Sequence, residues 1–64
     1  MRHSEFWSRL HEALGEVSAR HWAETHAITE LGSRTAVEAL DAGESPRRVW
    51  LAVWRTLELP PSSR

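Results

Sequence analysis

The 64-residue sequence contains no cysteine, lysine, asparagine, glutamine or tyrosine. Without cysteine the chain forms no disulfide, no thiolate metal site and no thiol redox centre, which fits a reducing compartment. Without asparagine and glutamine it lacks the two side chains that pair with both hydrogen-bonding groups of adenine in DNA. These absences remove several common routes to function at once.

Long apolar runs are also missing. The start, Met-Arg-His-Ser-Glu, has no apolar stretch after its basic residue, and no later segment has the length of a membrane span. We therefore expect neither export nor membrane insertion, and a cytoplasmic protein.

Charge is nearly balanced. All eight basic residues are arginine, and nine acidic residues bring the formal net charge to −1. A module held to nucleic acid by phosphate contacts is usually distinctly basic. DNA binding by this chain would therefore need a local basic face.

The sequence shows no catalytic constellation, phosphate-binding loop or metal motif. Its four histidines, His3, His11, His21 and His26, are spaced so that they do not share one helical face. A chain this short seldom encloses a pocket large enough for catalysis. We predict a noncatalytic protein, not an enzyme, with no cofactor and no metal.

The size of the chain limits its core. A single domain of this length buries about 60% of the surface that its unfolded chain exposes. Each aromatic side chain can bury roughly 150 to 250 Å², and four of the residues are tryptophan: Trp7, Trp22, Trp50 and Trp54. We expect Trp50 in the core, and Trp7 and Trp54 toward the edges of their apolar stripes.

The first half of the sequence predicts two helices. One runs from Glu5 to Leu14, because its apolar residues fall on one arc and Ser4 is a suitable N-cap. The second runs from Glu16 to Leu31, with Gly32 as its stop.

The second half predicts two shorter helices joined by a tight turn. Thr35 and Glu38 form a capping-box pattern before a helix over Ala36–Ala42, which Gly43 ends. Ser45 and Pro46 then begin a helix that ends near Leu57 or Glu58.

Two adjacent prolines stop this last helix and leave an extended, flexible tail over residues 60–64. Residues 1–59 are then one helical domain. The predicted fold is all-α, a compact bundle of three to four short helices with a helix-turn-helix-like corner in its C-terminal half.

Several motifs together resemble a known family of small actinobacterial proteins, the domain of unknown function 3046. The motifs are Met1-Arg2, Ser4-Glu5-Phe6-Trp7, Leu31-Gly32, Arg34-Thr35-Ala36, Glu38-Ala39-Leu40, Gly43, Pro46-Arg47, Val49-Trp50 and Pro60-Pro61. Members are often encoded near the RecA recombinase and its regulator RecX. The resemblance therefore implies a link to recombination or repair, and it implies no catalytic residue.

The turn between the last two helices allows two functional interpretations. Arg48, Leu51 and Arg55 lie on the outward arc of the last helix, where a DNA-recognition helix would meet the major groove. Arg47 lies at the margin of this arc and Trp54 at the edge of the apolar stripe. Arginine, leucine and tryptophan at one surface are also typical of a protein interface.

Charge decides our preference between them. Asp41, Glu44 and Glu58 lie near the arginines and reduce the attraction for phosphate. We predict a protein-binding or adaptor module whose partner is another protein, contacted through Arg47, Arg48, Leu51, Trp54 and Arg55. A helix-turn-helix-type DNA-binding protein, or an accessory protein in recombination or repair, is the alternative.

Overall fold

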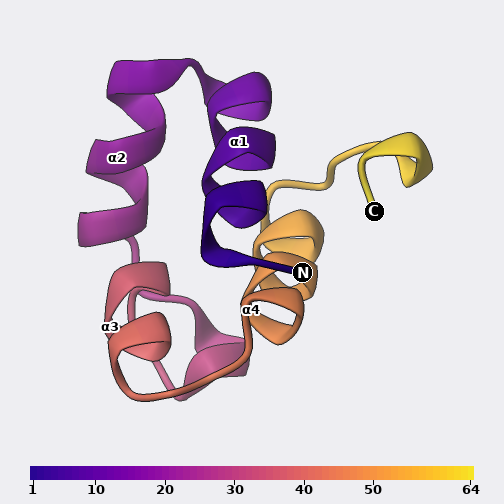
Figure 1. Ribbon diagram of the computed structural model, residues 1–64. Helices are drawn as coiled ribbons and strands as arrows, with labels where there is room; N and C mark the ends of the chain where they lie inside the picture. The colour runs from indigo at the N-terminus through magenta and orange to yellow at the C-terminus, as the bar shows by residue number, and fades with distance from the viewer.

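Four α-helices and two short 3-10 turns make up the computed structural model, which describes all 64 residues. The elements are α1 (His3–Leu14), α2 (Glu16–Thr25), η1 (Thr29–Leu31), α3 (Ala36–Asp41), α4 (Pro46–Thr56) and η2 (Pro61–Ser63). Figure 1 shows α1 and α2 side by side and antiparallel, with α4 against α1 and α3 below the end of α2. The all-α fold class predicted from the sequence is confirmed. None of the helices combines the length and the apolar character needed to cross a membrane.

The first helix starts earlier than the sequence pattern predicts. It begins at His3, after Arg2, and no side chain caps its first turn. Ser4 therefore lies inside the helix, and its predicted capping role is wrong. Gly15 alone separates α1 from α2; its backbone has φ +87° and its N–H donates to the His11 carbonyl at 2.8 Å.

The prediction of a second helix reaching Leu31 is wrong. The helix α2 ends at Thr25, whose hydroxyl donates to the His21 carbonyl at 2.7 Å. Ile28 then pairs with Arg34 in an isolated antiparallel bridge, with a 2.8 Å bond from the Ile28 N–H to the Arg34 carbonyl. The intervening loop buries Ile28 and Leu31 in the core, so tertiary burial overrides the helical spacing of these apolar residues.

The capping box before α3 is present as predicted. The Thr35 hydroxyl accepts from the Glu38 N–H at 3.1 Å, and the Glu38 carboxylate accepts from the Thr35 N–H at 2.8 Å. The helix ends at Asp41, one residue before the predicted end, and Ala42 is its C-cap. Gly43 follows in the left-handed region with φ +96°.

The start of α4 also follows the sequence pattern. The Ser45 hydroxyl accepts from the Arg48 N–H at 3.1 Å, and Pro46 occupies the first turn. The helix ends at Thr56 with Leu57 as C-cap. Glu58 then takes a left-handed conformation, φ +52°, and reverses the chain.

The segment after α4 is not extended, contrary to the prediction. Residues Pro61–Ser63 form the 3-10 turn η2, with the Ser63 N–H bonded to the Pro60 carbonyl at 2.9 Å. In Figure 1 this turn stands out to the side of the bundle, on the side of α4, and the indoles of Trp50 and Trp54 bond to its backbone.

Thirteen apolar residues from every helix and from the loop after α2 form one core. They are Phe6, Leu10, Ala19, Ala23, Ile28, Leu31, Ala36, Ala39, Leu40, Val49, Trp50, Ala52 and Val53. The rings of Phe6 and Trp50 meet edge to face at its centre, with centroids 6.0 Å apart, and both are fully buried. Buried alanines on α2, α3 and α4 have little side-chain bulk, which lets these short helices approach closely.

Trp50 should be the most costly single residue to truncate. Because its ring is fully buried and has Phe6 as a packed neighbour, Trp50→Ala should lower the free energy of unfolding by about 3 to 5 kcal/mol. Urea unfolding followed by circular dichroism measures this, with Val17→Ala as control because Val17 is 86% exposed. Similar unfolding midpoints for the two variants would show that the Trp50 ring does not anchor the core.

Gly43 and Glu58, the left-handed residues that follow α3 and α4, should respond to substitution with stability changes of opposite sign. Both α3 and α4 end in the same hydrogen-bond pattern. The Glu44 N–H donates to the Ala39 carbonyl at 3.1 Å, and the Leu59 N–H donates to the Trp54 carbonyl at 3.1 Å. Gly43→Ala should lower the free energy of unfolding by about 1 kcal/mol. The new methyl group would clash with no atom, but alanine is strained in the left-handed conformation of this position. Glu58→Gly should relieve that strain and stabilise by up to about 1 kcal/mol, measured by the same urea series. Equal shifts of the unfolding midpoint in the same direction would contradict this description of the ends of α3 and α4.

Candidate functional site

The outward face of α4 carries three of the five residues predicted to bind a partner. Arg48 and Arg55 are exposed, and Leu51 lies half-buried between them. Their spacing, three and then four residues, places them on one side of the helix as the sequence predicts.

Arg55 forms a two-pronged ion pair with Glu30 of η1. Its Nε lies 3.0 Å from both carboxylate oxygens, and its Nη2 lies 2.7 Å from Oε2. These hydrogen bonds hold the pKa of Glu30 below its ordinary value of 4.5, and the positive charges of Arg55 and then Arg48 lower it further. The pair fixes the guanidinium against the loop that follows α2.

Arg48 pairs with Glu44 of the turn before α4, at 3.2 Å between Nε and Oε1. Both arginines on the outward face therefore have a carboxylate partner within the chain. The face combines two cations, two anions and one leucine, and it carries no net charge.

Arg47 and Trp54 lie along α4 on the side that meets the tail. This side adjoins the outward face, since Arg47 precedes Leu51 by one helical turn. Arg47 donates to the main-chain oxygen of Arg64, the last residue, at 2.8 Å, and the Trp54 indole N–H donates to the Pro60 carbonyl at 2.9 Å. The guanidinium of Arg64 lies over the Trp54 ring, 5.5 Å from its centroid. The five predicted residues thus divide between two adjoining surfaces of one helix.

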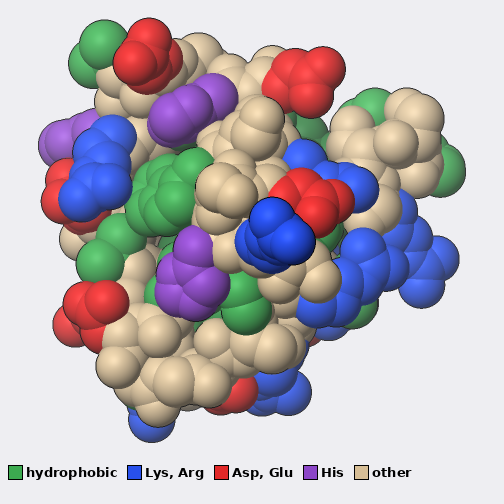
Figure 2. All heavy atoms as spheres, in the orientation of Figure 1, with side chains coloured by type: hydrophobic (Ala, Val, Ile, Leu, Met, Phe, Trp, Pro, Cys, Tyr) green, Lys and Arg blue, Asp and Glu red, His purple; other side chains and the backbone are tan.

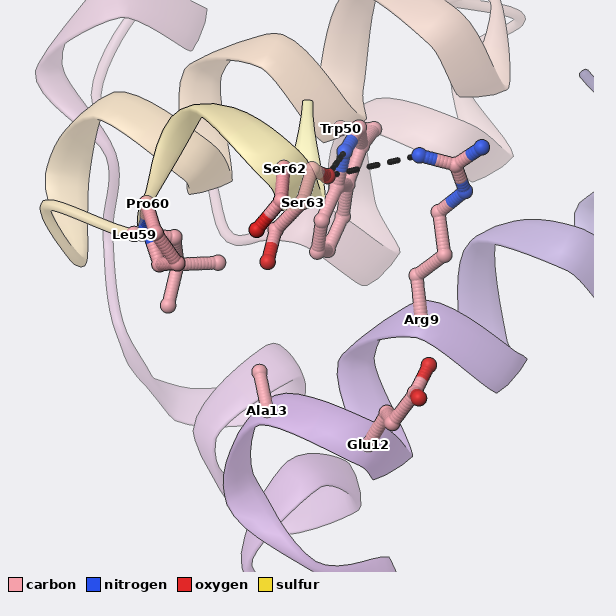
Figure 3. Close-up of a pocket in the computed structure, with 8 residues that line it drawn as sticks. All are labelled: Arg9, Glu12, Ala13, Trp50, Leu59, Pro60, Ser62 and Ser63. Atoms are coloured by element: carbon pink, nitrogen blue, oxygen red, sulfur yellow. Dashed lines mark hydrogen bonds between the residues drawn. The ribbon is translucent and has the colours of Figure 1, made fainter.

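A cavity of about 590 Å³ lies between α1 and the tail (Figure 3). Eight residues line it: Arg9, Glu12, Ala13, Trp50, Leu59, Pro60, Ser62 and Ser63. The Ser63 carbonyl accepts from the Trp50 indole at 2.9 Å and from Arg9 at 3.3 Å, as the dashed lines in Figure 3 show. The Arg9 guanidinium of α1 and the Trp50 indole of α4 therefore meet at one backbone carbonyl.

A second hollow of about 490 Å³ lies against α2 and the end of α1. The Trp22 ring stacks on His26 with centroids 4.9 Å apart, and Val17 beside it is the most exposed large apolar residue of the chain. On the face drawn in Figure 2, hydrophobic side chains over this region lie next to histidines. No three histidine or acidic side chains gather where they could hold a metal ion.

Sequence reasoning missed the partners of the arginines. Glu44 and Arg48 are four residues apart, a spacing at which ion pairs form across a helix start, so this pair had a readable signal. Glu30 and Arg55 are 25 residues apart, so no local spacing predicts their pairing. The tail is held by main-chain oxygens, which every residue has, so the sequence does not indicate which of them bind.

The Glu30–Arg55 pair predicts a pH dependence of stability. Because the folded pKa of Glu30 lies below 4.5, the pair stabilises the fold fully above that value. The contribution is lost as the pH falls through the folded pKa. The stability difference between the parent and Arg55→Met should therefore be present at pH 7 and vanish in acid. NMR titration should place the Glu30 midpoint below 4.5 in the parent and higher in Arg55→Met.

Arg20→Met is the matched control, since Arg20 pairs with Glu24 on the surface of α2, at 3.4 Å. It should leave the Glu30 titration unchanged. The same Glu30 titration midpoint in the parent and in Arg55→Met would show that the pair does not persist in solution.

A family model matches residues 1–62 of the chain, and the family is described as "Protein of unknown function (DUF3046)". Neither a search of curated proteins nor a search of solved structures finds a match. The matched region spans all four helices and most of the turn η2. The chain therefore belongs to the DUF3046 family, and the resemblance identified from its motifs is confirmed.

Proposed function

We propose that the protein is a noncatalytic protein-binding or adaptor module that contacts its partner through the outward face of α4. The observation that supports this most is the pairing of both arginines on that face, Arg48 with Glu44 and Arg55 with Glu30. A nucleic-acid phosphate would have to compete with these carboxylates, whereas a protein surface can pack against the neutral face without breaking them.

Leu51 is the natural centre of such a contact. It is half-buried, and the two ion pairs flank it along the helix. An apolar centre with a polar rim is the usual anatomy of a protein interface. The ion pairs also hold the arginine side chains in place before binding, which reduces the entropy lost on association.

DNA binding, with a role in recombination or repair, is the second candidate, and one observation favours it. Neither Arg47 nor Arg64 pairs with an acidic side chain within the chain. Figure 2 shows basic side chains gathered on the side of the molecule that carries the tail. Phosphate contacts by this function would involve that edge of α4.

Leu51→Asp tests the protein-binding proposal. The carboxylate would enter a desolvated patch and should reduce partner capture by at least about tenfold in a cross-linking pull-down, while circular dichroism shows the helices retained. Val17→Asp is the matched control, because it places the same charge on an exposed apolar residue of α2. Capture lost with Val17→Asp and kept with Leu51→Asp would move the interface to α2 and overturn the proposal.

A gel-shift titration of the same protein with duplex DNA tests the alternative. We expect no complex whose affinity falls steeply with added salt. A complex in the micromolar range that weakens with salt, and that is lost when Arg47, Arg48 and Arg55 are all changed to alanine, would establish DNA binding instead.

A further inference from the structure

The groove between α1 and α4 already holds a peptide, which is the chain's own segment Leu59–Arg64. We propose that this groove is a binding site for a proline-rich segment of another protein, and that the tail occupies it in the unbound state. The inference rests on the proposed protein-binding function and names the chemistry of the partner. It also assigns a role to Trp54 and Arg47, which lie outside the neutral face of α4.

Side chains of the two helices hold the tail by its main-chain oxygens. Three main-chain oxygens along the segment accept hydrogen bonds, those of Pro60, Ser63 and Arg64. The donors are the Trp54 indole at 2.9 Å, the Trp50 indole at 2.9 Å together with Arg9 at 3.3 Å, and the Arg47 guanidinium at 2.8 Å. Every one of these four bonds ends on a main-chain oxygen.

Recognition through carbonyl oxygens does not depend on the side chains of the bound peptide. Another segment with the same backbone path would satisfy the same four donors. The one side-chain contact among the polar interactions is Arg64 over the Trp54 ring, a cation–π contact with a 5.5 Å separation. It favours an arginine four residues after the first proline of the partner segment.

Proline suits this groove for a physical reason. Pro60 has φ −67° and ψ 156°, which is the polyproline II conformation. The first of the oxygens held by the groove belongs to Pro60, and the other two belong to Ser63 and Arg64. A proline at the first position offers its carbonyl to the Trp54 indole without adding a peptide N–H that would need a partner. Aromatic grooves recognise proline-rich segments in the polyproline II conformation, which here is that of Pro60, while Pro61–Ser63 continue as a 3-10 turn. A partner segment would place a proline at the position of Pro60 and turn after it, and the fixed φ of proline lowers the entropy cost of binding.

The tail leaves part of the groove empty. The cavity of about 590 Å³ lies between the tail and α1, with Glu12 and Ala13 of α1 on the far wall (Figure 3). The near wall is the tail itself, through Leu59, Pro60, Ser62 and Ser63. This volume lies within the range of pockets that take up small molecules or side chains. A partner segment with larger side chains than Ser62 and Ser63 would gain contacts that the tail does not make.

Because the tail is tethered, it competes with any free peptide at a high effective concentration, about millimolar for a short link. The apparent affinity for a partner is reduced by the fraction of molecules whose groove is closed. Loosening the tail while leaving the groove intact should therefore strengthen the binding of an added peptide.

The test uses the full chain and the acetylated, amidated peptide Leu-Pro-Pro-Ser-Ser-Arg. NMR follows the indole N–H signals of Trp50 and Trp54 in the parent and in a variant with Pro60→Gly and Pro61→Gly. We expect the peptide to shift both signals, with an apparent affinity about tenfold higher in the variant, because glycine frees the unbound tail. A peptide in which glycine replaces both prolines should bind about tenfold more weakly than the proline peptide.

Two further variants keep the proposal falsifiable. Arg64→Ala loosens the tail through the loss of one contact and should raise the peptide affinity by a smaller factor. Trp54→Phe, made in the glycine variant, removes an indole donor and should weaken the peptide about fivefold. No indole shift in the loosened variants at millimolar peptide, or equal binding of the proline and glycine peptides, would overturn the proposal.

The outcome separates this inference from the proposed function. Leu51 takes part in none of the four hydrogen bonds to the tail, so Leu51→Asp should bind the peptide as the parent does. If Leu51→Asp abolishes partner capture and the peptide does not bind, the protein-binding function stands and the proposal of a peptide site in the groove is refuted. If the peptide binds and Leu51→Asp leaves partner capture unchanged, the groove stands and the outward face of α4 is not the interface.

Discussion

The burial of Trp50 is the constraint on which the rest of the structure depends. Its ring meets Phe6 of α1 edge to face, and its indole N–H bonds to the carbonyl of Ser63 in the tail. One side chain thus joins the first helix, the last helix and the final turn. A chain of 64 residues has little apolar area to spare, so a single aromatic contact between distant segments carries an unusually large share of its stability.

The ends of the helices then set which groups face outward. The Schellman-type ends of α3 and α4, at Gly43 and Glu58, reverse the chain at two points. The first reversal places Glu44 beside Arg48, and the second returns the tail along α4. The loop after α2 brings Glu30 to Arg55. The neutral face of α4 and the groove under the tail are therefore products of the same local turns.

The two surfaces of α4 complement each other as a proposed interaction site. One is a neutral face around Leu51, and the other is a donor-rich groove lined by two indoles and two guanidinium groups. A protein that extends a proline-rich segment beside a flat docking surface would engage both at once. Such a partner gains affinity from the linked contacts, even though each surface alone is small.

The sequence by itself determined the family, the all-α class, the capping box at Thr35, the start of α4 and the central place of Trp50, because each depends on local spacing or on a single large apolar residue. It overextended α2, since the helical spacing of Ile28 and Leu31 is the same whether they continue a helix or fold back into the core. Only the tertiary structure decided the partners of the arginines and the position of the tail. Glu30 and Arg55 are distant in the chain, and the carbonyls that hold the tail belong to the backbone, which is the same at every residue and leaves no mark in the sequence.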